Sequence, residues 1–256
     1  MTAIRNLFAA ACLCAAGIAP ATAQGTTFTN GSFDAGSLTG WQAHGDVLAV
    51  GGQVRMTNAS TEFDDDDLGV GNEGRLNQSG TAAVDFFQSL SLAGIPVQNF
   101  DIGGLAYEGS AIRQDFTAFG GNSLTVTFDW AFSSNDTLPS DFGFLTINNT
   151  VHRVVDANTR YLSSNFLGSA VDDDDQNVRW SWYQSSYTYQ ASGNGTVSLA
   201  LGVVDIGDTQ YTSQMRFDNI AVSAVPEPET YALMLGGLGL MGVYIRRRRT
   251  GAHLQS

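Results

Sequence analysis

Apolar and polar positions alternate most regularly in the middle of the chain, between residues 124 and 132. One set of alternate positions carries Leu124, Val126, Phe128, Trp130 and Phe132, and the residues between them are mainly polar. Because successive side chains of a β-strand point to opposite faces, this pattern predicts a strand with one buried face and one polar face. Trp130 is therefore expected in the core.

Similar short runs recur along the chain and are separated by Gly, Asn, Asp and Ser, which favour turns. Helical periodicity is limited to a turn around residues 82–90. The pattern predicts an all-β fold, an antiparallel jelly-roll β-sandwich, although an immunoglobulin-like sandwich has the same number of strands. Six further strand candidates are Asp46–Thr57, Ser110–Phe116, Phe142–Ile147, Val178–Tyr189, Thr196–Asp205 and Met215–Val222.

Composition favours a packed, turn-rich protein over a disordered one, with 43% hydrophobic residues, 29 glycines and 14% charged residues. The formal net charge is −13. Such an acidic surface repels phosphate backbones and attracts divalent cations, so nucleic acid is not expected as a partner. Both cysteines, Cys12 and Cys14, lie near the N-terminus, which excludes disulfides and cysteine nucleophiles from the rest of the chain.

The first 23 residues have the pattern of a secretory signal peptide. Arg5 supplies positive charge, an apolar run follows from Leu7 to Ile18, and Ala21-Thr22-Ala23 fits the small-x-small cleavage site of signal peptidase. We therefore expect export, with Gln24 as the first residue of the mature chain and one β-sandwich domain over residues 24–223.

The C-terminal region has three parts. A proline-containing spacer spans residues 224–230, an apolar segment spans residues 231–245, and a basic tail spans residues 246–256. Fifteen helical residues reach only about 22 Å, against roughly 30 Å of bilayer hydrocarbon, so the single hydrophobic helix expected here suits a temporary membrane anchor. The arginine cluster predicts a cytoplasmic end.

This order of spacer, glycine-containing apolar segment and basic cluster resembles the PEP-CTERM sorting tail, also catalogued as the ice-binding-protein C-terminal domain. The resemblance implies transient recognition by an exosortase, a membrane-embedded protease, after which the protein reaches the cell surface or the extracellular matrix. It also implies a link to exopolysaccharide and biofilm. The residues that carry the motif are Pro226, Glu227, Pro228, Arg246, Arg247, Arg248 and Arg249.

Two short stretches of the expected domain resemble carbohydrate-binding or galactose-binding-like jelly rolls. One is the opening Asn30-Gly31-Ser32-Phe33-Asp34, followed by Gly40-Trp41, and the other is the closing Phe217-Asp218-Asn219-Ile220. The resemblance implies a structural calcium ion near the chain ends, with Asp218 as its carboxylate ligand and Asn30 and Asp34 as weaker candidates. Two tetra-aspartate runs, Asp64–Asp67 and Asp172–Asp175, read as solvated loops, with weak cation binding as the alternative.

Aromatic residues are the candidates for stacking on sugar rings, because an aromatic face combines apolar area with a polar rim. An unbroken strand over residues 180–189 would place its tryptophans on one face and its tyrosines on the other, so that one set is exposed unless a bulge intervenes. The candidates are Trp180, Trp182, Tyr183, Tyr187 and Tyr189.

Catalytic motifs are lacking in the sequence. The three histidines, His44, His152 and His253, form no pairing motif, and the nucleophile-elbow, zinc-protease and phosphate-loop patterns are absent. The leading hypothesis is a non-enzymatic, exosortase-sorted surface or matrix protein associated with extracellular polysaccharide. A specific carbohydrate-binding module is the alternative, and a glycan-processing enzyme is the least favoured.

Overall fold

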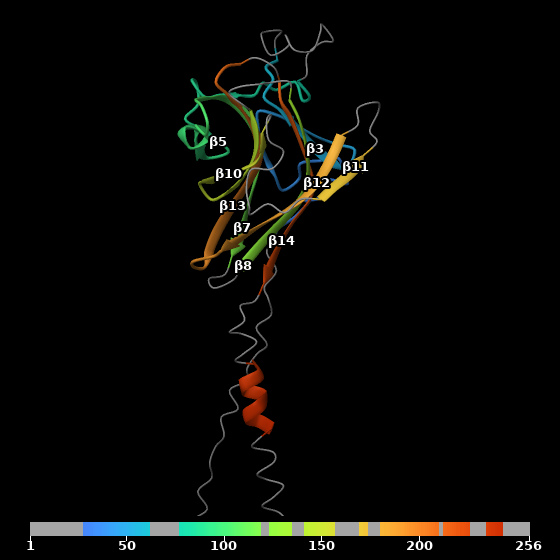
Figure 1. Cartoon of the computed structure of the whole chain (residues 1–256), viewed down its shortest axis with the longest axis vertical. Coiled ribbons are helices and arrows are strands. Elements are labelled where there is room, and N and C mark those ends of the chain that lie inside the picture. The colour runs from blue at the N-terminus through green and yellow to red at the C-terminus, as the bar shows by residue number, and fades with distance from the viewer. Residues whose placement is uncertain are drawn as a thin grey trace, which may run out of the picture.

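The structure is a computed structural model, and it describes residues 28–61, 77–118, 123–134, 141–156, 169–173, 180–209, 212–225 and 234–242. Two six-stranded sheets pack face to face in a β-sandwich, and a helix follows at residues 234–242 (Figure 1). The predicted signal peptide, Pro226–Pro228 and the arginine cluster lie outside the described residues.

Sheet A has the strand order β1 (Gln42–His44), β7 (Ala106–Ala118), β13 (Gly195–Ile206), β9 (Phe142–Ile147) and β10 (Thr150–Asp156), and β4 (Val84–Asp85) also pairs with β7. Sheet B has the order β11 (Ser169–Asp173), β12 (Trp180–Gln190), β8 (Ser123–Ser133), β14 (Gln214–Val225), β3 (Gln53–Thr57) and β2 (Asp46–Val50). A small third sheet pairs β5 (Ser91–Leu92) with β6 (Ile95–Pro96).

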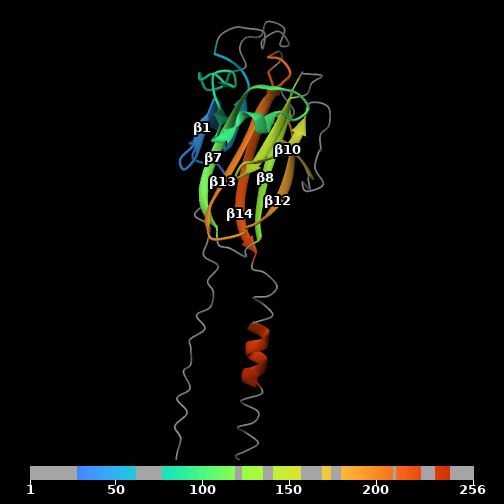
Figure 2. The ribbon, with the colours of Figure 1, turned by 90° about the vertical axis from the view of Figure 1, so that its left-hand side faces the viewer.

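The strand order confirms the jelly roll. Eight strands form four nested antiparallel pairs: β3 with β14, β7 with β13, β8 with β12, and β9 with β10. The outermost pair joins the first and last of these eight strands, as a long hairpin does when it is rolled up into a double sheet. Figure 2 shows these strands running along the length of the sandwich.

Most of the predicted strands are confirmed, and β8 and β9 lie where the pattern placed them. The single strand expected over Asp46–Thr57 was wrong, because the structure has a hairpin there. Gly51 and Gly52, both with positive φ, form the turn between β2 and β3. The pattern did not indicate β1, β4, β5, β6, β10 or β11.

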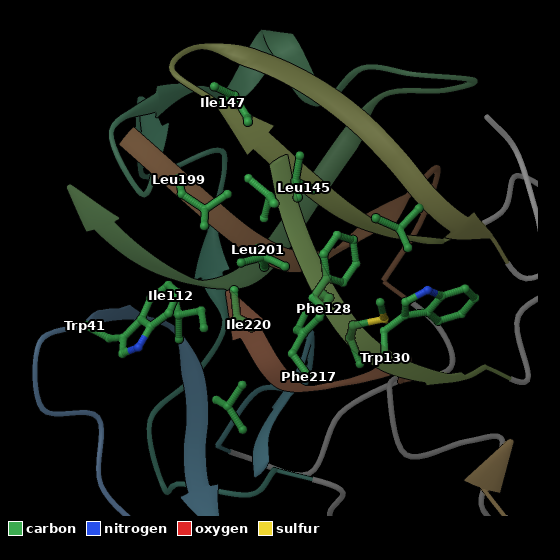
Figure 3. Packing of buried hydrophobic residues seen from close by; sticks show 14 of the residues in the cluster. Trp41, Ile112, Phe128, Trp130, Leu145, Ile147, Leu199, Leu201, Phe217 and Ile220 are labelled. Atoms are coloured by element: carbon green, nitrogen blue, oxygen red, sulfur yellow. The ribbon is translucent and has the colours of Figure 1, made fainter. Parts of the chain in front are cut away.

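The main core lies between the two sheets. Phe128, Trp130 and Phe217 of sheet B face Leu145 and Leu201 of sheet A, and all five are at most 1% exposed (Figure 3). The indole nitrogen of Trp130 donates to Ser185 Oγ at 2.8 Å, which satisfies its one polar group. The predicted position of Trp130 in the core is confirmed.

A second core covers the outer face of sheet A. The segment 84–105, here called the strap, contains β4, β5, β6 and the 3-10 helix η2 (Val97–Phe100). Its Leu92 and Phe100 are fully buried, and Phe100 packs on Phe144 of β9 with ring centroids 4.9 Å apart. All six residues of β9 are consequently buried, which explains the nearly continuous apolar runs in the central strands of this sheet.

One arginine fastens the strap to the sheet. Arg113 of β7 donates to the Ala93 carbonyl at 2.8 Å, to Ser198 Oγ at 2.7 Å and to Asp115 Oδ1 at 2.9 Å. Gly94 has φ of 78°, which favours glycine, and a Cβ there would lie 2.2 Å from Arg113 Nη1, so a larger residue would displace the guanidinium. The strap is therefore held on sheet A by both packing and hydrogen bonds.

The helix at residues 234–242 carries exposed apolar side chains. Met234, Leu235, Leu238, Leu240 and Met241 are between 58% and 75% exposed. Figure 1 shows this helix beyond the end of β14, clear of the sandwich. Within the described part of the chain, no helix has the length and apolar character needed to cross a bilayer.

Candidate functional site

The predicted sugar-stacking residues lie on β12, whose side chains alternate as expected. Tyr183, Tyr187 and Tyr189 face the core between the sheets, and Tyr183 stacks on Trp130 at 4.8 Å. Trp182 points to the opposite face, where it packs on Ala131 and is only 6% exposed. The expectation that one aromatic set would be exposed is therefore wrong for Trp182 and Tyr183; the side chain of Trp180 lies outside the described part.

Tyr187 and Tyr189 instead lie at one edge of the sandwich, half-buried. The Tyr187 ring packs on His152 of β10 with centroids 4.3 Å apart, and Asn148 Nδ2 donates to the Tyr189 hydroxyl at 3.2 Å. Burial raises the pKa of Tyr187 and lowers the pKa of His152. The Tyr187 and Tyr189 rings and the Asn148 amide thus lie at this edge, but both tyrosines are partly used for packing within the domain.

The predicted calcium ligands lie close in the fold but are occupied by protein partners. Asn30 Nδ2 donates to the carbonyls of Ser37 and Thr39, and the Asp34 carboxylate accepts from Ser32 Oγ at 2.7 Å. The carbonyls of Asn30 and Gly31 accept hydrogen bonds from the Trp41 indole and the Ile220 amide. These contacts fit a capped turn better than an ion site, and the calcium hypothesis stays a prediction.

The neighbouring β14 contains a bulge at the Asp218-Asn219 motif. Asn219 has φ of 50°, which asparagine tolerates better than most residues, and its Nδ2 donates to Asp129 Oδ2 at 2.8 Å. Asp218 Oδ1 accepts from the Asn219 backbone N–H at 2.6 Å. This sequence motif therefore has a local structural role in shaping the strand.

No group of three or more His, Cys, Asp or Glu residues that could hold a metal occurs in the described part of the chain. Asp172 and Asp173 belong to β11, whereas Asp64–Asp67, Asp174 and Asp175 lie outside that part. His44 of β1 and His152 of β10 are on separate strands. Burial, with a smaller contribution from Arg113, lowers the pKa of His44.

An aromatic pair formed by an exposed residue of the strap and a half-buried residue of β7 was not predicted from the sequence. Phe87 is 71% exposed, and its ring meets Tyr107 of β7 edge-on at 5.2 Å. Asp85 fixes the turn beneath Phe87 by accepting its backbone N–H at 2.7 Å and the Gln88 side-chain amide at 2.6 Å. We call Phe87 and Tyr107 the aromatic platform.

The sequence contained one signal for this platform. Phe86 and Phe87 are consecutive, and when two large aromatic residues share a tight turn, only one can point inward. Phe86 is 8% exposed and packs on Phe100, which leaves Phe87 outside. The strap also carries Leu90 and Leu105, which are 85% and 51% exposed. Three of the four exposed large apolar side chains in the described sandwich thus belong to this one segment.

The last feature is the junction between the sandwich and the tail. β14 ends at Val225, and Pro226, Glu227 and Pro228 follow directly in the sequence. Residues 224–249 match the model of the PEP-CTERM protein-sorting motif. The C-terminal segment is a PEP-CTERM motif. This motif implies export, exosortase-dependent and membrane-associated sorting, and delivery to the cell surface.

Comparison with other proteins adds little about the sandwich itself. No curated protein matches the chain significantly. A solved structure described as "CBM4 structure and function" is similar over 75% of this chain and 99% of its own, with 11% identity and a TM-score of 0.38. The enzymatically active domain of bacteriophage CBA120 tailspike protein 4 shares 11% identity with a TM-score of 0.33, and 78% of this chain covers only 21% of that chain. Both TM-scores are low, so the jelly-roll assignment rests on the strand order.

Proposed function

We propose that this protein is a non-enzymatic surface protein whose jelly roll binds extracellular polysaccharide through the aromatic platform. The observation that carries the proposal is the 71% exposure of Phe87 on a turn that hydrogen bonds hold in place. Burying a phenylalanine side chain stabilises a fold by about 1.5–3 kcal/mol, and Phe87 forgoes most of that contribution. An exposed aromatic ring that its own turn holds in place offers a free apolar face to a ligand.

The chemistry of the platform suits a sugar ring. The apolar C–H face of a pyranose can lie on the Phe87 ring, whose orientation is fixed by edge-on contact with Tyr107. Gln88 and Ser91 are exposed beside it and offer polar groups to sugar hydroxyls. Extracellular polysaccharide also fits a protein that the PEP-CTERM motif directs to the surface.

The edge around Tyr187 is the second candidate surface for the same ligand. Tyr187 and Tyr189 are half-buried, and the Tyr187 ring is already packed on His152, so they offer less free aromatic area than Phe87 does. A glycan-processing enzyme is the third candidate, and nothing in the described site residues favours it over binding.

Binding of the full-length protein in detergent to a glycan array, and to exopolysaccharide from the producing cells, tests the proposal. Phe87→Ala should weaken binding at least about tenfold, the effect of losing about 1.4 kcal/mol of stacking. Phe87→Leu separates ring stacking from general apolar contact, because leucine keeps apolar area but has no aromatic face. Tyr187→Ala is the matched control at the second surface.

The outcomes distinguish the candidates. Unchanged binding by Phe87→Ala together with loss in Tyr187→Ala would move the site to the sandwich edge. Wild-type protein that binds no glycan and no exopolysaccharide would contradict polysaccharide binding altogether. Because Phe87 is exposed, its two variants should keep the wild-type melting temperature. Tyr187→Ala removes a half-buried ring that packs on His152, so it should melt lower, and its binding is measured at a temperature where it is fully folded.

A further inference from the structure

The end of the sandwich from which the tail leaves is built from the ends of five strands. Val225 of β14 pairs with Ser123 of β8, and Ser123 pairs with Gln190 of β12. On sheet A, Ala118 pairs with Gly195. We call these residues, together with the turn 191–194, the tail-proximal end; it is the lower end of the sandwich in Figures 1 and 2.

This end differs from the rest of the chain in charge. Residues 116–128, 185–204 and 219–226 contain no Asp, Glu, Lys or Arg, in a protein with 25 acidic residues. The exposed residues 192–196 are Ser, Gly, Asn, Gly and Thr, all neutral. Along β8 the first carboxylate is Asp129, about 20 Å from Ser123 at the usual strand rise. Along β7 the carboxylate nearest to this end is Asp115, and its Oδ1 lies 2.9 Å from Arg113 Nε in an ion pair.

The sequence also limits how far this end can lie from a membrane. Five residues separate Val225 from Tyr231, where the apolar segment begins, and the six steps between these two residues span at most about 20–22 Å. The headgroup layer takes up roughly 5–7 Å of that reach. While the apolar segment is in the bilayer, the tail-proximal end is therefore held within about 13–17 Å of the lipid headgroups, which is less than about two Debye lengths of about 8–10 Å each.

We propose that the tail-proximal end is a membrane-apposed face whose partner is the surface of an anionic lipid bilayer. Anionic headgroups repel carboxylates within a Debye length, and the spacer contributes Glu227 and Glu229, but the sandwich end itself is neutral and can approach where the acidic remainder cannot. Charge then sets one orientation, with the strap and β5 pointing away from the membrane (Figure 1). This inference does not depend on polysaccharide binding.

Site-specific fluorescence quenching tests the orientation. Cys12 and Cys14 are the chain's two cysteines, so with both replaced by Ser an introduced cysteine is the sole labelling site. The full-length protein is reconstituted in vesicles of phosphatidylcholine and phosphatidylglycerol that carry a headgroup-attached quencher. A label at Thr196→Cys should be quenched several-fold more than a label at Ser91→Cys on β5. Equal quenching at the two positions, or stronger quenching at Ser91→Cys, would overturn the proposal.

A charge substitution separates electrostatic orientation from simple tethering. Adding Ser192→Asp should reduce quenching at the Thr196→Cys label in anionic vesicles, and should leave it unchanged in vesicles of phosphatidylcholine alone. Ser192 is exposed, so the fold should tolerate the change. If Ser192→Asp leaves the quenching unchanged in both kinds of vesicle, the tether alone sets the distance between the label and the membrane, and the role of charge is refuted.

Discussion

Gly202→Ala tests whether sheet A is covered on both faces, which is the condition that holds the strap and its aromatic platform in place. Gly202 lies in β13, the central strand of sheet A, between Ala111 of β7 and Phe144 of β9. A Cβ there would meet the Ser110 carbonyl oxygen at 2.3 Å and the Phe144 ring at 2.5 Å. Neither neighbour can move freely, because Ser110 belongs to the strand ladder and Phe144 packs beneath Phe100 of the strap.

The expected destabilisation is that of an overpacked core, about 3 kcal/mol. For a domain of this size each kcal/mol shifts the melting temperature by about 2–4 °C, so Gly202→Ala should melt about 6–12 °C below the wild type. Differential scanning calorimetry on the purified protein measures this shift. Gly193→Ala is the matched control, because nothing lies within 4 Å of a Cβ at that position, and it should change stability by no more than about 0.5 kcal/mol.

A melting temperature for Gly202→Ala within a degree or so of the wild type would refute the reasoning. It would mean that both the strand ladder at Ser110 and the Phe144 ring beneath the strap can shift without loss, and hence that sheet A and the strap are not packed as described. If Gly202→Ala binds glycans more weakly at temperatures where it stays folded, the packing of the strap on sheet A is needed to position the aromatic platform.

Three further predictions concern smaller parts of the fold. Burial lowers the folded-state pKa of His44 and His152 below the ordinary value of about 6.5, so the unfolded chain binds protons that the folded chain excludes. Stability should be full above pH 6.5 or so and fall as the pH drops below it, and His152→Gln should flatten part of the fall in a series of melting curves. Asn219→Ala should cost about 1–2 kcal/mol in urea unfolding, because alanine is strained at φ of 50° and cannot bond Asp129, and Asn219→Gly should cost less. If the predicted ion site binds calcium, the melting temperature should be higher with calcium than with EDTA, and Asp218→Asn should abolish the rise; the same melting temperature in both conditions would refute the ion site.

The alternation of apolar and polar residues predicted those strands whose burial can be read from their own residues. The alternation over 124–132 identified β8 and its buried face, because a strand with one face in the core and one polar face carries its periodicity in its own residues. The same reasoning placed Tyr183, Tyr187 and Tyr189 on one face of β12. It failed for the exposure of Trp182, because whether an outward side chain is covered depends on neighbours outside the strand.

The strap shows why the rest could not be predicted. Its strands are only two residues long, and its four-residue 3-10 helix is too short to give a periodic signal. Sheet A is apolar on both faces because the strap covers it, yet the sequence of β9 reads the same whether its second face meets a strap or a second sheet. Phe87 is exposed only because Phe86 takes the inward position. The aromatic platform could therefore be identified only from the three-dimensional structure.

One strand connects the fold to its sorting. β14 pairs with β3 through its first four residues, whereas its last five residues pair with β8, so their loss would unpair the beginning of β8 in sheet B. The PEP-CTERM motif begins at residue 224 and overlaps this strand by only Ala224 and Val225. Pro226 has no N–H to extend the ladder, so the first proline of the recognition sequence also marks the last residue of the sandwich. Cleavage at or beyond Pro226 would consequently leave every backbone pairing of β14 intact. The cleaved protein would then keep the complete sandwich.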